Sequence, residues 1–166
     1  MNSHQIESAL QTLRVNAKVY PANRLPNTIS TPCALVVNMD PDTKPGSHWI
    51  AIFIDKYKNG EYFDSYGLPP QVDYHKKFLS TACKKWVHNS LGLQSYDTTV
   101  CGQYCLIFLY FKTHGRSLRE FLKIFPGNSL KNDTLVVQLY NKLFKHVIRK
   151  KLSHHARTQS CCCRRF

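Results

Sequence analysis

The feature that most constrains the fold is a segment that is apolar on nearly all sides. It covers residues 102–111, GQYCLIFLYF. A helix with such a surface is stable only when other elements cover it, so we expect it to form the buried centre of the fold. A chain of 166 residues has the length of one domain. We predict a single domain over 1–149, followed by a basic, cysteine-rich and unstructured tail over 150–166.

Short apolar runs predict a small sheet beside this helix. Residues 33–37 (CALVV) and 48–55 (HWIAIFID) are typical of buried strands. Asn59-Gly60 predicts a tight turn, after which 61–65 returns as a strand. The remaining pattern indicates an extended loop over 15–31 and helices over 3–14, 71–89 (with Trp86 and Val87 inward), 117–125 and 133–149. We expect an α+β fold with a small mixed or antiparallel sheet packed against helices.

The charge of the chain is strongly positive. Lys and Arg number 23 against 10 Asp and Glu, for a net charge of +13, and no acidic residue follows Asp133. Such a field attracts polyanions, nucleic acid first, through counterion release. We therefore expect DNA to bind a basic surface, the alternative being a solvated basic tail that only aids solubility.

Two cellular settings are disfavoured. No run approaches the roughly 18 apolar residues that a membrane-spanning helix needs. The first 25 residues also lack the continuous apolar stretch of a secretory signal. We expect an intracellular protein that is not secreted and has no membrane partner.

The seven cysteines do not form the pattern of a disulfide framework. Their number is odd and three are adjacent, at 161–163. Cys101 and Cys105 have a Cys-x3-Cys spacing, but no suitable second pair follows, so no metal site is predicted. The remaining interpretation is a reduced protein with one chemically important thiol.

Cys101 is the candidate for that thiol because it immediately precedes the buried helix. The positive end of a helix stabilises a thiolate and lowers its pKa. A thiolate nucleophile needs a base, usually a histidine. Among eight histidines, His48 is the one that adjoins a central strand. The alternative is a core histidine with a structural role.

Asp64 is the candidate partner of His48. It interrupts the apolar strand 61–65, and an inward carboxylate needs a partner. Asp64 would hold His48 in the tautomer that presents its other nitrogen to Cys101. The alternative is a solvent-facing carboxylate at a strand end.

The proposed pairing constrains the turn between the two strands. A two-residue turn at Asn59-Gly60 would set Asp64 opposite Asp55, roughly 23 Å from His48 at about 3.3 Å per residue. The pairing therefore requires a wider or bulged turn that starts before Lys58.

Gln94 lies in the polar loop before Cys101. Its amide can donate to the oxyanion that forms when a thiolate attacks a carbonyl, beside the backbone N–H of Cys101. The alternative is an ordinary surface glutamine.

Together these residues resemble a known family. The order His48-Trp49, then Asp64 before Ser-Tyr-Gly, then Gln94 seven residues ahead of Cys101-Gly102, is similar to that of the adenovirus-type cysteine endopeptidases, the adenains. Their wider clan includes the proteases of ubiquitin-like proteins such as SUMO. The resemblance covers roughly residues 18–148. It is greatest to the protease of Polinton (Maverick) transposons and their adintovirus relatives, in the segments HWIAIFID, EYFDSYG, LQS and VCGQYC.

The resemblance implies a papain-like catalytic unit with its groups in the chain order His, Asp, Gln, Cys. It implies four catalytic roles: Cys101 as nucleophile, His48 as general base and acid, Asp64 as the acid that orients it, and Gln94 as oxyanion donor. Trp49 and Gly102 are expected to line the substrate cleft. No metal or organic cofactor is implied.

Two activators are also implied, because adenains are stimulated by DNA and by a viral peptide that forms a disulfide with an enzyme cysteine. Cys83 lies 18 residues before Cys101, an interval similar to that of the enzyme cysteine. Its own pattern indicates an ordinary helix cysteine beside Trp86. Both interpretations stay open.

The predicted function is the cleavage of viral or transposon capsid precursors by a monomeric cysteine endopeptidase in the nucleus or the virion. One alternative is a protease that removes ubiquitin-like modifiers from proteins. Another is a basic nucleic-acid-binding or capsid-associated protein without catalytic activity.

Overall fold

The computed structural model describes residues 1–144. The predicted tail, 150–166, lies outside the described residues, as does the end of the helix predicted over 133–149. The elements in chain order are α1 (Ser3–Leu10), β1 (Asn16–Tyr20), the 3-10 turn η1 (Ala22–Arg24), β2 (Cys33–Asn38), β3 (Trp49–Ile54), β4 (Asn59–Phe63), α2 (Asp73–Ala82), β5 (Lys85–His88), α3 (Cys101–Thr113), α4 (Leu118–Leu122) and the helical residues 129–144.

The strands form one mixed sheet in the order β1-β2-β3-β4-β5. The central strand β3 is antiparallel to both of its neighbours, β2 and β4, while β1 is parallel to β2 and β5 is parallel to β4. The predicted α+β class with a small mixed sheet is confirmed.

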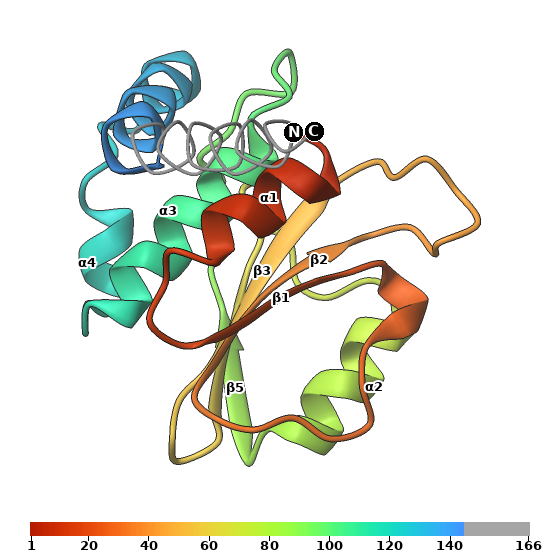
Figure 1. The fold of residues 1–166 in the computed structure, drawn as a ribbon. Helices are drawn as coiled ribbons and strands as arrows, with labels where there is room; N and C mark the ends of the chain where they lie inside the picture. Colours follow the sequence, from red (N-terminus) through yellow and green to blue (C-terminus); the bar gives the residue numbers. More distant parts are fainter. Residues whose placement is uncertain (145–166) are drawn as a thin grey trace, which may run out of the picture.

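Helices cover both faces of the sheet, with α1, α3 and α4 on one side of the strands and α2 on the other (Figure 1). Alternate residues of β2 point to opposite faces, so Ala34 and Val36 pack in the cluster with α3, whereas Leu35 and Val37 pack with α2. All six residues of β2 are therefore buried. This two-sided burial explains why the central strands are continuous apolar runs.

The predicted central helix is confirmed as α3, which packs against β3. Phe108 of α3 stacks on Phe63 of β4, with ring centroids 4.8 Å apart. Phe121 of α4 meets both rings edge-on, at 5.3 Å and 5.5 Å. Within residues 1–144, no helix has the length and apolarity that crossing a bilayer needs.

Two local predictions were wrong. Residues 16–20 form β1 rather than part of a loop, and 85–88 form β5 rather than the end of a helix. Both are short edge strands that are only partly covered. β1 (NAKVY) alternates polar and apolar residues, but over five positions only, and β5 (KWVH) shows no such alternation. Trp86 and Val87, predicted to face inward, are exposed at 37% and 57%.

The turn between β3 and β4 also differs from the first expectation. Asn59 and Gly60 belong to β4, and the turn consists of the preceding residues. Lys58 adopts the left-handed conformation at φ 67°, and the Asp55 carboxylate accepts hydrogen bonds from the Tyr57 and Asn59 backbone N–H groups, each at 2.8 Å. The wider turn that the pairing of His48 with Asp64 requires is therefore present.

Candidate active site

His48 and Asp64 meet at one end of the β3–β4 hairpin. His48 immediately precedes β3 and Asp64 immediately follows β4. Because Ala51 pairs with Phe63, continuing this antiparallel register sets Asp64 opposite Ile50. His48 Nε2 lies 2.9 Å from Asp64 Oδ1.

The Asp64 carboxylate is almost completely buried, at 1% exposure. Its Oδ1 also accepts the Tyr66 backbone N–H at 2.8 Å. A buried carboxylate needs such donors, because removal from water penalises its charge. Asp64 is thus an inward, hydrogen-bonded group rather than a solvent-facing one.

Cys101 is the first residue of α3, and its buried thiol meets the other side of the His48 ring. The thiol is hydrogen-bonded to His48 and to the backbone of Trp49 and Gly102. Since Nε2 of His48 is held by Asp64, Nδ1 is the ring nitrogen left for Cys101. The structure therefore brings Cys101, His48 and Asp64 together in that order.

The electrostatics of the pair favour charge separation. Burial by itself lowers the pKa of His48, but hydrogen bonds to Asp64 and Cys101 outweigh it and raise the pKa from 6.5 to about 9. Burial by itself raises the pKa of Cys101, but the His48 hydrogen bond and the backbone groups bring it below its ordinary value of 9.0. Both shifts act in the direction of a thiolate beside an imidazolium.

The other described cysteines have the opposite tendency. Burial raises the pKa of Cys33 to about 12 and that of Cys83 to about 11. Cys105, also in α3, is fully buried with a pKa well above 9.0, and its thiol donates to the Trp49 carbonyl at 3.3 Å. Cys101 is the one thiol within residues 1–144 whose pKa is lowered.

Gln94 is buried in the loop before α3 and its amide has three partners. The Ser65 hydroxyl donates to Oε1 at 2.8 Å, while Nε2 donates to the Thr98 carbonyl at 2.9 Å and to the Tyr66 hydroxyl at 3.3 Å. Gln94 is therefore not the ordinary surface glutamine of the alternative interpretation.

Two further residues at this site were not predicted from the sequence. The Tyr66 ring stacks on the His48 ring, with centroids 4.9 Å apart. The Asn89 amide holds the backbone of Asp64 at two points, accepting its N–H at 2.9 Å and donating to its carbonyl at 2.7 Å. Tyr66 belongs to the Ser-Tyr-Gly turn after Asp64, so the motif could have indicated it. Nothing in the residues around Asn89 indicates its role.

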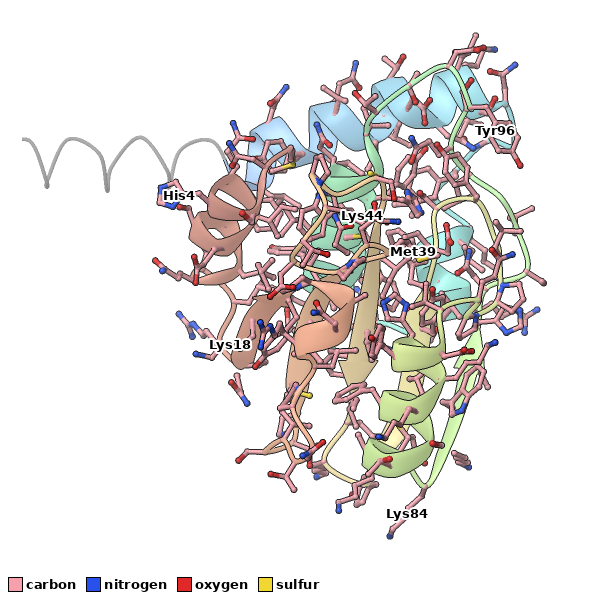
Figure 2. All side chains as sticks on the ribbon, turned by 90° about the vertical axis from the view of Figure 1, so that its right-hand side faces the viewer. His4, Lys18, Met39, Lys44, Lys84 and Tyr96 are labelled. Carbon is pink, nitrogen blue, oxygen red and sulfur yellow. The ribbon has the colours of Figure 1, made fainter. Side chains whose placement is uncertain are left out.

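Aromatic residues continue from His48 to the surface. Tyr96 stacks on Tyr66 at a centroid distance of 4.9 Å and remains highly exposed. Figure 2 shows Tyr96 at the outer rim of the molecule. The rings of His48, Tyr66 and Tyr96 thus form one continuous stack.

Trp49 and Gly102, predicted to line the cleft, both lie against Met1. The Trp49 indole N–H donates to the Met1 carbonyl at 3.1 Å. A Cβ added at Gly102 would stand 3.2 Å from the Met1 Cβ, so the N-terminal residue closely covers this helix end. A cavity of about 560 Å³ opens beside Met1 and Trp49 and is also lined by residues of the segment 40–46; Gly102 is not among its lining residues.

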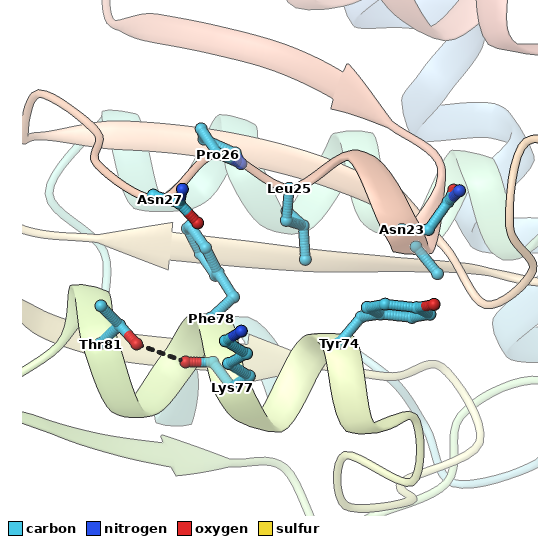
Figure 3. A pocket seen from close by; sticks show the side chains of 9 residues that line it. Asn23, Leu25, Pro26, Asn27, Tyr74, Lys77, Phe78 and Thr81 are labelled. Carbon is cyan, nitrogen blue, oxygen red and sulfur yellow. Dashed lines mark hydrogen bonds between the residues drawn. The ribbon is translucent and has the colours of Figure 1, made fainter.

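A second cavity, of about 200 Å³, lies between η1 and α2 and includes none of the predicted site residues. Figure 3 shows its side chains, among them Tyr74 and Phe78 from α2 and Pro26 from the loop that follows η1. Cys83 is half-buried where α2 ends, with an extended backbone, rather than within the helix.

Comparisons with known proteins identify the fold. No family model matches the sequence, and no curated protein matches it. Among solved structures, the SUMO protease Ulp1 with its catalytic cysteine oxidised to a sulfinic acid is similar, with a TM-score of 0.54, 14% identity, and coverage of 89% of this chain and 78% of that chain. The ASFV pS273R protease is similar with a TM-score of 0.56, 18% identity, and coverage of 81% of this chain and 65% of that chain. The predicted adenain-like protease fold is thereby confirmed.

Proposed function

We propose that this protein is a cysteine endopeptidase with Cys101 as nucleophile and His48 as its general base and acid. The observation that carries the proposal is the hydrogen bonding of His48 on both sides, to Asp64 at 2.9 Å and to the Cys101 thiol at the start of α3. The fold shared with two proteases supports it.

The proposed reaction starts from the thiolate–imidazolium pair. The Cys101 sulfur attacks a peptide carbonyl carbon, and the electron pair of the C=O bond moves to oxygen, where Gln94 and the Cys101 backbone N–H stabilise it. The oxyanion collapses, the C–N bond breaks, and His48 gives its proton to the leaving amine. Water then attacks the thioester, with His48 as base, and releases a carboxylic acid and the thiolate.

We further propose capsid precursors of a virus or transposon as substrates, with the protein acting as a monomer in the nucleus or the virion. The resemblance of the motifs to the Polinton branch of the adenains supports this choice. Stimulation by DNA through the +13 charge, and by a peptide through Cys83, belongs to the same proposal. The half-exposed position of Cys83 beside β5 is compatible with a disulfide to a partner.

A second candidate function is the removal of ubiquitin-like modifiers. The structural similarity to the SUMO protease Ulp1 favours it. Such an enzyme cleaves after a Gly-Gly tail, so a panel of fusions ending in Gly-Gly, compared with capsid precursors encoded by the same element, separates the two substrate classes.

The first test is the reactivity of Cys101. We expect iodoacetamide near neutral pH to modify Cys101 in preference to Cys83, and His48→Ala to abolish that preference, because the imidazolium no longer stabilises the thiolate. Mass spectrometry locates the modified residue. If Cys101 reacts no faster than Cys83, with or without added DNA, the catalytic proposal fails and the non-catalytic nucleic-acid-binding alternative gains support.

A further inference from the structure

Asp133 is a buried carboxylate for which the proposed mechanism has no use. It lies in the helical residues 129–144 and is 5% exposed. Its Oδ2 accepts the Thr98 hydroxyl at 2.7 Å and the Ser95 backbone N–H at 3.2 Å, and its Oδ1 accepts the Tyr104 hydroxyl at 2.9 Å. A buried charge is costly unless donors surround it, so these contacts fasten the loop before α3 to this helix.

Neighbouring contacts fasten the same loop at further points. The Asn132 amide donates to the Leu93 carbonyl at 3.0 Å. From the sheet side, the backbone N–H groups of Leu93 and Gln94 both donate to the Ser65 carbonyl, at 2.8 Å and 3.0 Å. The loop is thus held between the end of β4 and the helical residues 129–144.

Thr98 connects Asp133 to Gln94. Its hydroxyl is bound by Asp133, and its backbone carbonyl accepts a hydrogen bond from Gln94 Nε2 at 2.9 Å. Because a carbonyl oxygen can only accept, this contact decides which end of the Gln94 amide is the nitrogen. The Ser65 hydroxyl, which donates to Oε1, agrees with that orientation.

The second N–H of the Gln94 amide has a weaker partner. Nε2 lies 3.3 Å from the Tyr66 hydroxyl, against 2.9 Å to the Thr98 carbonyl. A developing oxyanion is a far stronger acceptor than a neutral hydroxyl. The N–H that is bonded to Tyr66 is therefore the one that can donate a hydrogen bond to the substrate oxygen. The other N–H stays bonded to the Thr98 carbonyl and keeps the amide in place.

We propose that Asp133 is a positioning residue of the oxyanion hole, which acts through Thr98 to hold the Gln94 amide with one N–H available for the substrate oxygen. This inference rests on the proposed function, because an oxyanion forms only when Cys101 attacks a carbonyl. It assigns a role in catalysis to a helix that contributes none of the four proposed catalytic groups.

The test compares two reactions of the same thiol. Alkylation by iodoacetamide displaces iodide at a saturated carbon and forms no oxyanion, whereas acylation by p-nitrophenyl acetate does. Thr98→Val removes the hydroxyl but keeps the shape and the backbone carbonyl. We expect it to slow acylation about tenfold and to leave alkylation within about twofold of wild type. Thr98→Ser, which keeps the hydroxyl, should restore acylation.

A matched control separates positioning from stability. Thr113→Val removes an equivalent hydroxyl, bonded to the Tyr110 carbonyl at 2.9 Å, at the opposite end of α3. It should leave both rates unchanged. Equal losses of acylation and alkylation in Thr98→Val, or no loss of acylation, would overturn the positioning role.

A double variant tests the route through Gln94. Gln94→Ala alone should slow acylation, and adding Thr98→Val should slow it no further, because the hydroxyl acts through the missing amide. If the two substitutions slow acylation independently, so that their fold losses multiply in the double variant, the inference is contradicted. If wild type shows no release of p-nitrophenolate that depends on Cys101, the proposed function itself fails. If wild type is active and Thr98→Val is equally active, only the positioning role fails. Asp133→Asn tests the carboxylate directly, and Thr98→Val carries the test should that variant not fold.

Discussion

His48 Nε2 lies 2.9 Å from Asp64 Oδ1, although 16 positions separate the two residues in the chain. The distance is set by the length of the turn between β3 and β4. Had the turn been centred on Asn59-Gly60, every residue of β4 would have moved along β3 and Asp64 would have lain roughly 23 Å from His48. The left-handed conformation at Lys58 and the Asp55 carboxylate that caps the turn therefore determine whether the pair forms.

Asp64→Asn should disable the site without unfolding the protein. An amide can present its NH2 group to His48 and so favour the wrong tautomer, which costs about 10²–10⁴ in rate where an aspartate orients a catalytic histidine. The measurement is Cys101-dependent acylation by p-nitrophenyl acetate at pH 7. Asp73→Asn is the matched control, because that side chain is 96% exposed. Equal rates in wild type and Asp64→Asn would remove Asp64 from the mechanism.

Alkylation of Cys101 should follow a different pH profile from that of Cys83. A thiol reacts as its thiolate, so the rate rises as pH passes the thiol pKa. The pKa of Cys101 is lowered from 9.0 by His48, against the effect of burial, whereas burial raises that of Cys83 to about 11. At pH 7 we expect iodoacetamide to label Cys101 and almost no Cys83. At pH 10 we expect the labelling rates of the two cysteines to be closer to each other. Coincident profiles would exclude the ion pair.

Acid should destabilise the fold through His75. This residue is fully buried beneath the sheet, and burial lowers its pKa from 6.5 to about 4. Between these values the unfolded chain binds a proton that the folded one does not, so stability is complete above pH 6.5 and falls as pH decreases toward 4, by up to about 3 kcal/mol. Urea unfolding at pH 7 and pH 4.5 measures the loss. His75→Gln, which keeps a donor for the Asn38 carbonyl, should reduce it, and an unchanged loss would assign the acid sensitivity to other groups.

Asn89→Ala should destabilise the protein by about 2–3 kcal/mol. It leaves the backbone N–H and carbonyl of Asp64 buried without the partners that they have now, and such groups cost about 1–3 kcal/mol. Urea denaturation measures the change in the free energy of unfolding. Asn27→Ala, at an exposed position, is the control and should change it by less than about 0.5 kcal/mol. A loss as small as that of the control would show that water replaces the amide at no cost.

The elements that the sequence predicted are those whose burial is strong and periodic. The run 102–111 is α3, and CALVV and HWIAIFID are the central strands β2 and β3. A segment that is covered on every side must be apolar on every side, so it can be recognised in the sequence without knowing which elements cover it. β1 and β5 were missed because both are short edge strands: hydrogen bonds to one neighbour determine them, and four or five residues are too few for alternation to distinguish a strand from a loop.

The pattern of residues along the chain was enough to indicate which side chains can do chemistry: a cysteine at the start of an apolar helix, a histidine at the start of a central strand, a carboxylate at the end of the next strand, and a glutamine seven residues before the cysteine. The distances between these side chains depend on how the chain folds. The turn at Lys58 places Asp64 on His48, the packing of α3 on β3 brings Cys101 to the same ring, and Asn89 and Asp133 hold the loops from far along the chain. The sequence around a residue indicates its burial and its tendency to form a helix or a strand. Hydrogen-bond geometry depends instead on strand register and helix packing, which bring together residues that are far apart in the chain.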